Sequence, residues 1–475
     1  MITNKYQKRT FLLLACLTII RLFLSIFIDP DGAPAYYAIW SKHLQLSYFD
    51  HPSITAILIK ISTSIFGWNS FGIKFPGIIM FTVISIFIYK SIILLSKNYK
   101  GAFWAILLFN FTPWIASSFG IKGANPDIPF ILFYIMSFYY FIKLYKTDNP
   151  KYWYIISFLT ILGINSKYKM VFIYPSIIIV SLLIPKIRHH WKTKHLYIAG
   201  FTSLLGLLPI LIWNLNNNFA SFSYHLIERQ NPFNFNLIRY LTFLSNQLYI
   251  MGIFIPIILF KNLFTTRKTI ISKLCIAFAL PTLIIFSTII LFFSDAMQNW
   301  WASVYTIMFI AYGANKEITN TDKNILYFEI IIFILTTTLY IYPFIKFKEN
   351  TNFLDHHLFK EATEDLKTII KEEKYIATPR YRSTAMFNFY VSDKIIYSID
   401  WRKKDQFQLW YNPDTLKGKD IIYITIASQN KHPNNLFKFN KLELIKTKTY
   451  HYNKFFKRTF NFYKLYNFQG LQNAK

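Results

Sequence analysis

The chain has few cysteines and few charged residues. Its two cysteines, Cys16 and Cys275, both lie inside apolar runs with no cysteine nearby, so a disulfide framework and a cysteine-based metal site have no support. Only 16% of the 475 residues are charged, against about 25% in average soluble domains. Because 53% of the residues are hydrophobic, the composition excludes a single soluble globular domain.

Acidic residues are scarcer than basic ones. The 23 Asp and Glu stand against 52 Lys and Arg, which gives a formal net charge of +29. Such a charge alone would suggest a nucleic acid or an anionic surface as partner. The basic residues lie between apolar runs and form no contiguous patch, so we interpret most of them as flanks of membrane spans and expect no nucleic-acid partner.

Long apolar runs are the main feature that is present. A membrane span needs about 20 mainly apolar residues. Runs near this length predict about eleven spans, at residues 10–28, 75–95, 102–119, 128–145, 152–165, 170–185, 196–213, 243–260, 274–293, 299–315 and 325–345. The first run lacks a cleavage pattern, so we expect an uncleaved span. The short run at 152–165 leaves open a hairpin with 170–185 that enters without crossing.

The Lys and Arg residues between the runs predict the orientation. The connections on one side carry 18 of them and those on the other side carry 8. Basic residues favour the cytoplasmic side of a membrane. The bias therefore predicts a cytoplasmic N-terminus, and an odd number of spans places the C-terminal region outside.

Residues 346–475 differ in character from the rest. They hold 24 Lys and Arg against 13 Asp and Glu, and no apolar run long enough to span. The apolar spacing predicts a helix over 358–376 and short strands over 393–400 and 420–428. We therefore predict a membrane domain at 1–345 and a small soluble α/β domain at 346–475.

The first outer loop, residues 29–74, is long and contains two amphipathic stretches. Residues 35–46 and 53–66 are too short to cross a bilayer, so they are expected to lie along the membrane surface. Asp31 and Asp50 bracket the first stretch. Charged groups at this depth are costly unless they are used, which makes both carboxylates functional candidates.

Other outer loops supply an acid and three bases. A carboxylate such as Asp127, in GANPDIP, can accept a proton, although this position also suits an ordinary helix cap. Lys167 and Lys169 can hold a phosphate or can be snorkelling flanks of two spans. Arg229 can do the same, or it can pair with Glu228 at an exposed site.

The histidines indicate no definite metal site. His51 and His225 are both able to bind a metal, but no ligand cluster has recognisable spacing. The sequence therefore leaves a divalent metal open and indicates no other cofactor.

Several blocks together resemble a known family. They are AYYAIWSKHLQLSYFDHPSITAILIKISTSIFGWNSFGIKFP, NPDIPFILFY, GINSKYKMVFIYP, PILIWNLNNNFASFSYHLIERQ and QNWWASVY. In this order they resemble the bacterial members of the dolichyl-phosphate-mannose protein mannosyltransferase family, over about residues 10–310. These membrane glycosyltransferases have the GT-C fold and include the lipid A aminoarabinose transferases.

The resemblance implies an inverting transfer of a sugar from an undecaprenyl-phosphate carrier to an acceptor on the outer side of the bacterial inner membrane. The implied partners are the carrier-linked sugar, membrane lipids, and an acceptor that is lipid A, another envelope glycan or a protein. It also implies that Asp127 matches a second Asp of the family's site and that Lys167 and Arg229 contact the carrier phosphate. Further candidates for the cavity are Tyr36, Tyr37, His51, Asn214, His225, Asn299 and Trp300.

The sequence departs from the family at the catalytic base. Relatives usually have Asp-Glu directly before the AYY stretch, where this chain has Ala33 and Pro34. Three alternatives follow: Asp31 serves as the base, or Asp50 and Asp127 do, or this chain has lost transfer activity. A scaffold role would match the last alternative, and a transporter of lipid-linked sugar is a further hypothesis.

Overall fold

The computed structural model describes residues 4–230, 232–293, 297–348, 354, 356–370, 374–391, 394–399, 404–429 and 431–472. The chain folds into two compact units. The first comprises Met1–Leu24, Gln45–Leu58 and Lys74–Leu335, and the second comprises Ser25–Leu44, Ile59–Ile73 and Thr336–Lys475. The predicted division into 1–345 and 346–475 as functional domains stays a prediction.

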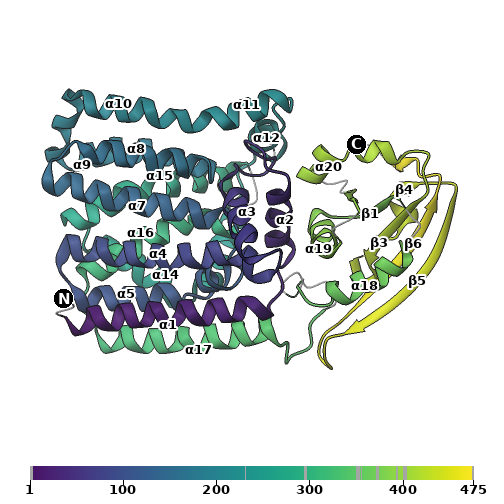
Figure 1. The fold of residues 1–475 in the computed structure, drawn as a ribbon. Coiled ribbons are helices and arrows are strands. Elements are labelled where there is room, and N and C mark those ends of the chain that lie inside the picture. Colours follow the sequence, from purple (N-terminus) through teal and green to yellow (C-terminus); the bar gives the residue numbers. More distant parts are fainter. Residues whose placement is uncertain are drawn as a thin grey trace. The chain divides into compact units, whose positions relative to one another are not determined.

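The first unit is helical, and its long helices run side by side (Figure 1). The elements that build it are α1 (Lys5–Phe27), α3 (Ile54–Phe66), α4 (Ser70–Ser96), α5 (Tyr99–Phe111), α6 (Pro113–Ile115), η1 (Ala116–Ile121), α7 (Asp127–Thr147), α8 (Lys151–Ile164), η2 (Tyr168–Phe172), α9 (Ile173–Leu183), η3 (Pro185–Lys192), α10 (Lys194–Ser203), η4 (Leu204–Leu207), α11 (Leu208–Asn216), α12 (Ala220–Ser223), η5 (Tyr224–Glu228), α13 (Leu237–Met251), α14 (Phe254–Thr265), α15 (Ile270–Phe292), η6 (Gln298–Trp301), α16 (Ala302–Asn315) and α17 (Asn320–Ile341). Some of these helices begin or end in the second unit.

Six helical segments among the described residues are long and apolar enough to cross a membrane. Three further helix pairs pass the same test but are bent, by 65° between α5 and α6–η1, by 119° between α9 and η3, and by 105° between α13 and α14. Pro113 and Pro185 begin the second halves of two of these pairs, where proline cannot continue a straight helix. Gly252, with a φ of 86°, ends α13 in a conformation that glycine adopts without strain.

These candidates are fewer than the about eleven spans predicted, and the exact number of spans stays a prediction. The structure supports six spans, or up to nine if each bent pair is one span. Helices occupy all eleven predicted runs, but α8 and α16 have only 14 residues each, which is short for a span. An apolar run indicates that a helix is removed from water. It does not distinguish a helix buried inside the bundle from a helix that faces lipid.

α16 illustrates that difference, because it forms the interior of the first unit. Every residue from Ala302 to Ala314 is buried, and α5, α7, α14 and α15 all pack against this helix. A side chain at Gly101 or Gly313 would collide with the backbone of the other helix, so α5 and α16 approach closely there.

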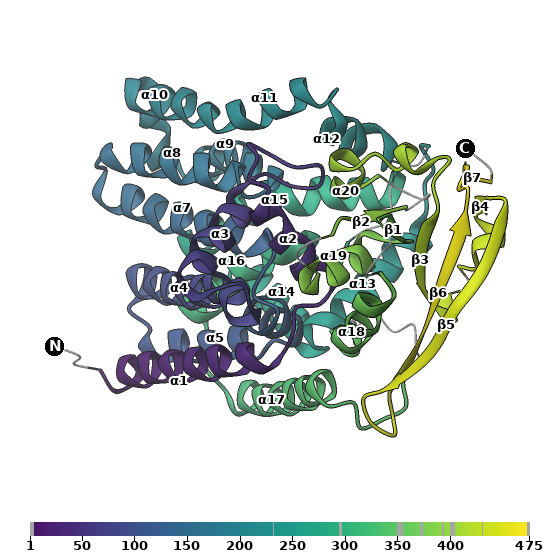
Figure 2. The same cartoon turned by 45° about the vertical axis from the view of Figure 1, so that its right-hand side comes forward.

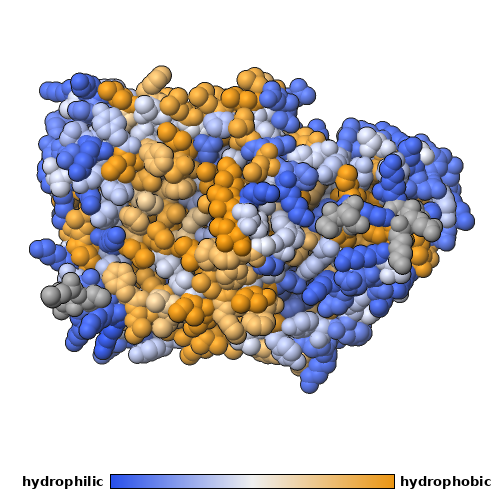
Figure 3. All heavy atoms as spheres, viewed as in Figure 1, coloured by the Kyte–Doolittle hydropathy of each residue, from blue (hydrophilic) through white to orange (hydrophobic). Residues whose placement is uncertain are grey.

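Apolar surface remains exposed on the outer helices of the first unit. Leu12, Phe201 and Ile238 are 67%, 73% and 78% exposed. Figure 3 shows hydrophobic atoms along the helices and hydrophilic atoms at their ends. A lipid environment accommodates such a surface, and a multi-pass membrane protein is the coarse architecture that the helices establish.

The second unit contains a mixed sheet. Its elements include α2 (Gly32–Lys42), α18 (Phe359–Ile369), β1 (Ile376–Thr378), α19 (Tyr381–Tyr390), β2 (Ile396–Ser398), α20 (Gln406–Trp410), η8 (Pro413–Leu416), β3 (Ile421–Ile426), η9 (Ala427–Gln429), η10 (Pro433–Asn435), β4 (Phe437–Lys438), β5 (Lys441–His451), β6 (Lys457–Tyr466) and β7 (Gly470–Leu471). The strand order is β2-β1-β3-β6-β5, and β4 pairs with β7 separately. β1 pairs in parallel with β2 and β3, whereas β6 is antiparallel to β3 and β5.

Two helices cover one face of this sheet (Figure 2). Phe460 on β6 contacts Phe359 on α18 and Phe387 on α19, with ring centroids 5.2 and 6.0 Å apart. Alternate side chains along β6 point to this face of the sheet, and the three rings bury it. The second unit therefore has an apolar core of its own.

The predicted elements of the second unit are partly confirmed. α18, β2 and β3 lie inside the stretches predicted as helix and strands. The hairpin of β5 and β6 was not predicted, because β5 is Lys-rich and mostly exposed and so lacks an apolar alternation. The two amphipathic helices exist as α2 and α3, and their position on a membrane surface stays a prediction.

A buried histidine gives this unit a pH dependence. His357 is 7% exposed, and burial lowers its pKa to about 4, while its Nε2–H donates to the Tyr340 carbonyl at 3.1 Å. Between pH 6.5 and 4 the unfolded chain binds the proton and the folded chain does not, so stability should fall on acidification by up to about 3 kcal/mol. Thermal unfolding of the full chain against pH measures this slope. His357→Gln, which retains an amide donor, should flatten it, and an unchanged slope in that variant would contradict the assignment.

Candidate active site

A buried ion pair joins two of the predicted residues in the first unit. Lys167 Nζ lies 2.7 Å from Asp127 Oδ1, and the two side chains are only 8% and 7% exposed. Asp127 is the first residue of α7, and its backbone N–H donates to the Asn125 side chain at 3.0 Å. Lys167 has an extended backbone in the turn between α8 and η2. The turn and the helix start therefore present the two groups to each other.

The second oxygen of this carboxylate is also occupied. Asn299, in η6, donates from Nδ2 to Asp127 Oδ2 at 2.6 Å. Asp127 lies in the first turn of α7, as the helix-start alternative expected, and its side chain also bonds Lys167 and Asn299. Since each oxygen accepts a hydrogen bond from a protein group, Asp127 orients Lys167 and Asn299.

Two further cations lie around this pair. Lys169 Nζ is 3.3 Å from the Asn299 carbonyl and 3.5 Å from the Trp300 carbonyl. It also interacts electrostatically with Lys167, Asp127 and Arg229. The Arg229 guanidinium lies 5.1 Å from the Trp300 ring centroid.

This geometry decides the alternatives for the basic residues. Lys167 is buried, so the snorkelling interpretation is wrong for this residue. Arg229 forms no ion pair with Glu228 in the part of the chain that the structure describes, and Glu228 instead accepts from Ser223 Oγ at 3.1 Å. Lys167 and Lys169 lie near the Asp127 carboxylate, and Arg229 lies near Lys169. This excess of basic groups suits an anion such as a phosphate.

Asp50, His51 and His225 form a second group in the first unit. His225 Nε2–H donates to the Asp50 carbonyl at 3.0 Å, and the two imidazole rings stack with centroids 6.3 Å apart. The His225 ring also contacts Tyr168, 5.6 Å away between centroids. These contacts place the group beside η2, the element that carries Lys169.

Asn214 has a structural task in the same unit. Its Nδ2 donates to the Ile210 carbonyl at 2.9 Å, and its Oδ1 accepts from the Phe222 N–H at 3.2 Å. These bonds tie the end of α11 to α12. The side chain is fully buried, so we expect it to shape this turn and to make no contact with a substrate.

Asp31, Tyr36 and Tyr37 belong to the second unit. Asp31 is 3% exposed and caps α2, accepting from the Ala33 N–H at 3.3 Å. Tyr36 Oη accepts from the Gln406 N–H at 2.8 Å, and Tyr37 packs edge-on against Trp40. Ala33 and Pro34, at the position of the family's acid pair, lie in the first turn of α2.

Two polar groups were missed in the sequence. In the first unit, the Arg21 guanidinium donates to the side chain and the carbonyl of Asn110, at 2.9 and 3.3 Å, which ties α1 to α5. The position of an Arg inside an apolar run was the available signal.

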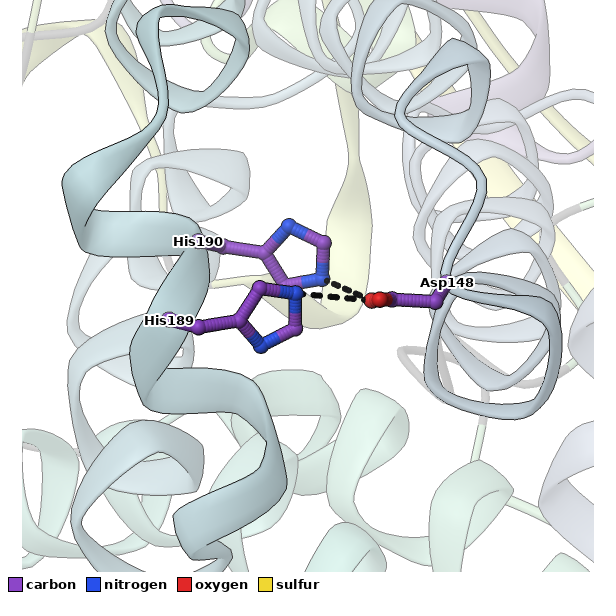
Figure 4. A group of neighbouring side chains, drawn as sticks. All are labelled: Asp148, His189 and His190. Carbon is purple, nitrogen blue, oxygen red and sulfur yellow. Dashed lines mark ion pairs between the residues drawn. The ribbon is translucent and has the colours of Figure 1, made fainter.

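The other missed group lies at the opposite end of α7 from Asp127 (Figure 4). His189 and His190 Nε2 lie 2.9 and 3.1 Å from Asp148 Oδ1. His190 Nδ1 accepts from the Trp153 indole at 3.2 Å, so a neutral His190 ring carries its proton on Nε2. The group therefore links the turn after α7 to η3 by close polar contacts.

Comparison with known proteins gives a partial sequence match and a match of the whole fold. The sequence model described as dolichyl-phosphate-mannose-protein mannosyltransferase matches residues 50–213. The structures of ArnT from Cupriavidus metallidurans, in the apo state and bound to undecaprenyl phosphate, superpose with a TM-score of 0.65. Each superposition covers 95% of this chain and 97% of the ArnT chain, with a sequence identity of 10% for the apo structure and 11% for the bound structure. The predicted resemblance is confirmed. This chain has the fold of ArnT.

One curated protein is similar to this chain over part of its length. The lipid A galacturonosyltransferase RgtD of Rhizobium johnstonii is 23% identical over 282 residues. The match covers 57% of each chain, so this chain spans little more than half of the length of that relative.

Proposed function

We propose that this chain is a membrane glycosyltransferase that moves a sugar from a polyprenyl-phosphate carrier to an envelope acceptor on the outer face of the bacterial inner membrane. The observation that carries the proposal is the buried cluster of Lys167, Asp127 and Asn299 with Lys169 and Arg229 beside it. Such a cluster suits a phosphate that gains negative charge as it leaves. The ArnT fold and the match to RgtD agree with this chemistry.

In the proposed reaction, an acceptor hydroxyl attacks the anomeric carbon of the sugar. The new carbon–oxygen bond forms as the bond to the carrier phosphate breaks, and the phosphate leaves with the electron pair. A direct displacement of this kind inverts the anomeric configuration. Lys167 and Arg229 stabilise the leaving phosphate, because preorganised cations in a site with little water are effective at developing charge.

The proton of the acceptor hydroxyl needs a base. Asp127 has both oxygens engaged, so we assign it the task of holding Lys167 in place. Asp31 takes the task of the base in this proposal, on the resemblance of the first outer loop to the family. Asp50, from the same loop, is the alternative in the test described in the Discussion.

The acceptor class follows from the relatives alone. We propose a lipid A-type acceptor, with another envelope glycan or a protein as the alternatives. No residue in the cluster identifies the sugar, and a divalent metal is not needed for the displacement as written.

Mass analysis of envelope lipids and glycans tests the proposal. Cells that lack the gene should lose one sugar from one envelope component, and the gene returned on a plasmid should restore it. The mass difference identifies the sugar, and the modified component identifies the acceptor. An unchanged envelope in the deletion strain would rule out the enzyme.

A further inference from the structure

An apolar groove opens in the first unit, away from the ion-pair cluster. It has a volume of about 370 Å³ and lies between α8, α9 and α10, with Ile156, Ile177, Gly200 and Leu204 among its walls. These helices form one side of the bundle in Figure 1. Nothing in the proposed transfer reaction uses the groove.

The polar atoms along the groove are already satisfied by the protein. Ser157 Oγ bonds Thr202 Oγ1 at 2.8 Å, Tyr174 Oη bonds Ser203 Oγ at 2.9 Å, and Thr160 Oγ1 donates to the Ile156 carbonyl at 2.7 Å. The walls therefore offer hydrocarbon contact and few unpaired hydrogen-bonding groups. A hydrocarbon chain is the occupant that such a surface favours.

Gly200 keeps the groove open. A Cβ atom built at Gly200 would meet no atom within 4 Å, so the missing side chain leaves space that no neighbour fills. Gly200 lies in the apolar segment Lys194–Asn216, which is long enough to span a membrane. The groove is therefore within reach of lipid along the length of that segment.

The charges at one end of the groove select the headgroup. Trp191, Leu196 and Tyr197 line that end, and Lys192 and Lys194 lie between them in the chain, both exposed. Neither lysine forms an ion pair or a side-chain hydrogen bond with the residues that the structure describes.

The surrounding segments are also basic. Residues 143–151 and 186–194 together contain seven Lys and Arg and one acid. That acid is Asp148, which is already engaged by His189 and His190. The end of the groove thus has a strong excess of positive charge.

The aromatic residues at this end are arranged as an interfacial pair. The Trp191 indole donates to Ser181 Oγ at 2.8 Å, and Tyr197 Oη donates to the Trp191 carbonyl at 2.7 Å. Trp and Tyr with apolar rings and polar tips are typical of the membrane–water boundary. The lysines beside them therefore lie at the depth of lipid headgroups.

We propose that the groove binds one acyl chain of an anionic phospholipid, with Lys192 and Lys194 holding its phosphate. Basic pockets between membrane helices recognise anionic headgroups in this way. The lipid would fill the space between α10 and the pair α8 and α9, and it would stabilise the packing of α10. This site is separate from the proposed transfer reaction and does not depend on it.

Lipid binding to the purified full chain tests the proposal. After removal of lipid in detergent, retention of phosphatidylglycerol, phosphatidylcholine with the same acyl chains, and undecaprenyl phosphate would be compared by native mass spectrometry. Phosphatidylglycerol should bind one equivalent more tightly than phosphatidylcholine and should raise the thermal midpoint. Lys192→Gln with Lys194→Gln should remove about 10- to 30-fold of that preference.

Two further variants distinguish specific binding of the lipid in the groove from nonspecific association of lipid with the protein. Gly200→Leu fills the groove and should abolish retention while leaving the midpoint of the lipid-free protein unchanged, and Gly200→Ala should have a smaller effect. The matched control is Lys261→Gln with Lys268→Gln, which removes two exposed lysines from α14 and its following turn and should change nothing. Equal retention of both phospholipids, retention unaffected by Gly200→Leu, or displacement of phosphatidylglycerol by undecaprenyl phosphate would each overturn the proposal.

Discussion

Lys167→Met is expected to lower sugar transfer by about 100- to 1,000-fold, the loss typical when one preorganised group that stabilises a leaving charge is removed. Methionine retains an unbranched apolar chain but has no charge to offer the phosphate. The rate of sugar incorporation in membranes from a complemented deletion strain, at matched protein level, measures the effect.

The same variant should also destabilise the protein. It leaves the buried Asp127 carboxylate with Asn299 as its remaining side-chain partner, which should cost about 3–5 kcal/mol in the free energy of unfolding. Lys167→Met combined with Asp127→Asn removes both charges and should recover most of that loss. Transfer should stay low in the double variant, whereas transfer that recovers with stability would contradict a phosphate-binding role for Lys167.

Asp31→Asn is expected to lower kcat by about 100- to 10,000-fold with little change in KM for the carrier, because a general base acts in the chemical step. Asparagine is as good a helix cap as aspartate, so α2 should keep its start and the protein its stability. The measurement is again the rate of transfer, together with the thermal midpoint of the purified variant.

Asp127→Asn and Asp50→Asn are the comparisons for that experiment. Asp127→Asn should reduce kcat less than Lys167→Met does, since the asparagine oxygen can still accept from Lys167 and Asp127 does not act on the substrate. If Asp127→Asn or Asp50→Asn abolished transfer while Asp31→Asn retained it, the base would be reassigned. If transfer appeared only after Ala33→Asp with Pro34→Glu, the natural chain would have lost the reaction.

The sequence identified the residues of the cluster, but it did not show which of them contact one another. Asp127, Lys167 and Asn299 were each identified from short blocks, because charged and amide groups beside apolar runs are unusual. Which acid faces Lys167 could not be read from those blocks. The answer depends on how α7 packs beside η2 and η6, and these elements are separated by 40 and 172 residues along the chain.

The fold was predictable where burial leaves a periodic pattern. Apolar runs located the helices, but they could not separate the interior helix α16 from a lipid-facing one, because both are apolar throughout. The hairpin of β5 and β6 was missed because its exposed strand is rich in lysine. The linkage of Asp148 to His189 and His190 was missed because it forms between two turns that no local pattern connects.

The measurement that tests the central claim most directly is mass analysis of envelope glycans in a deletion strain carrying the natural chain or the Lys167→Met, Asp127→Asn double variant. The account predicts that the natural chain restores one missing sugar and that the variant, folded and present at the same level, does not. Envelope glycans that are identical in the deletion strain and in both complemented strains would contradict the claim that this protein transfers a carrier-linked sugar.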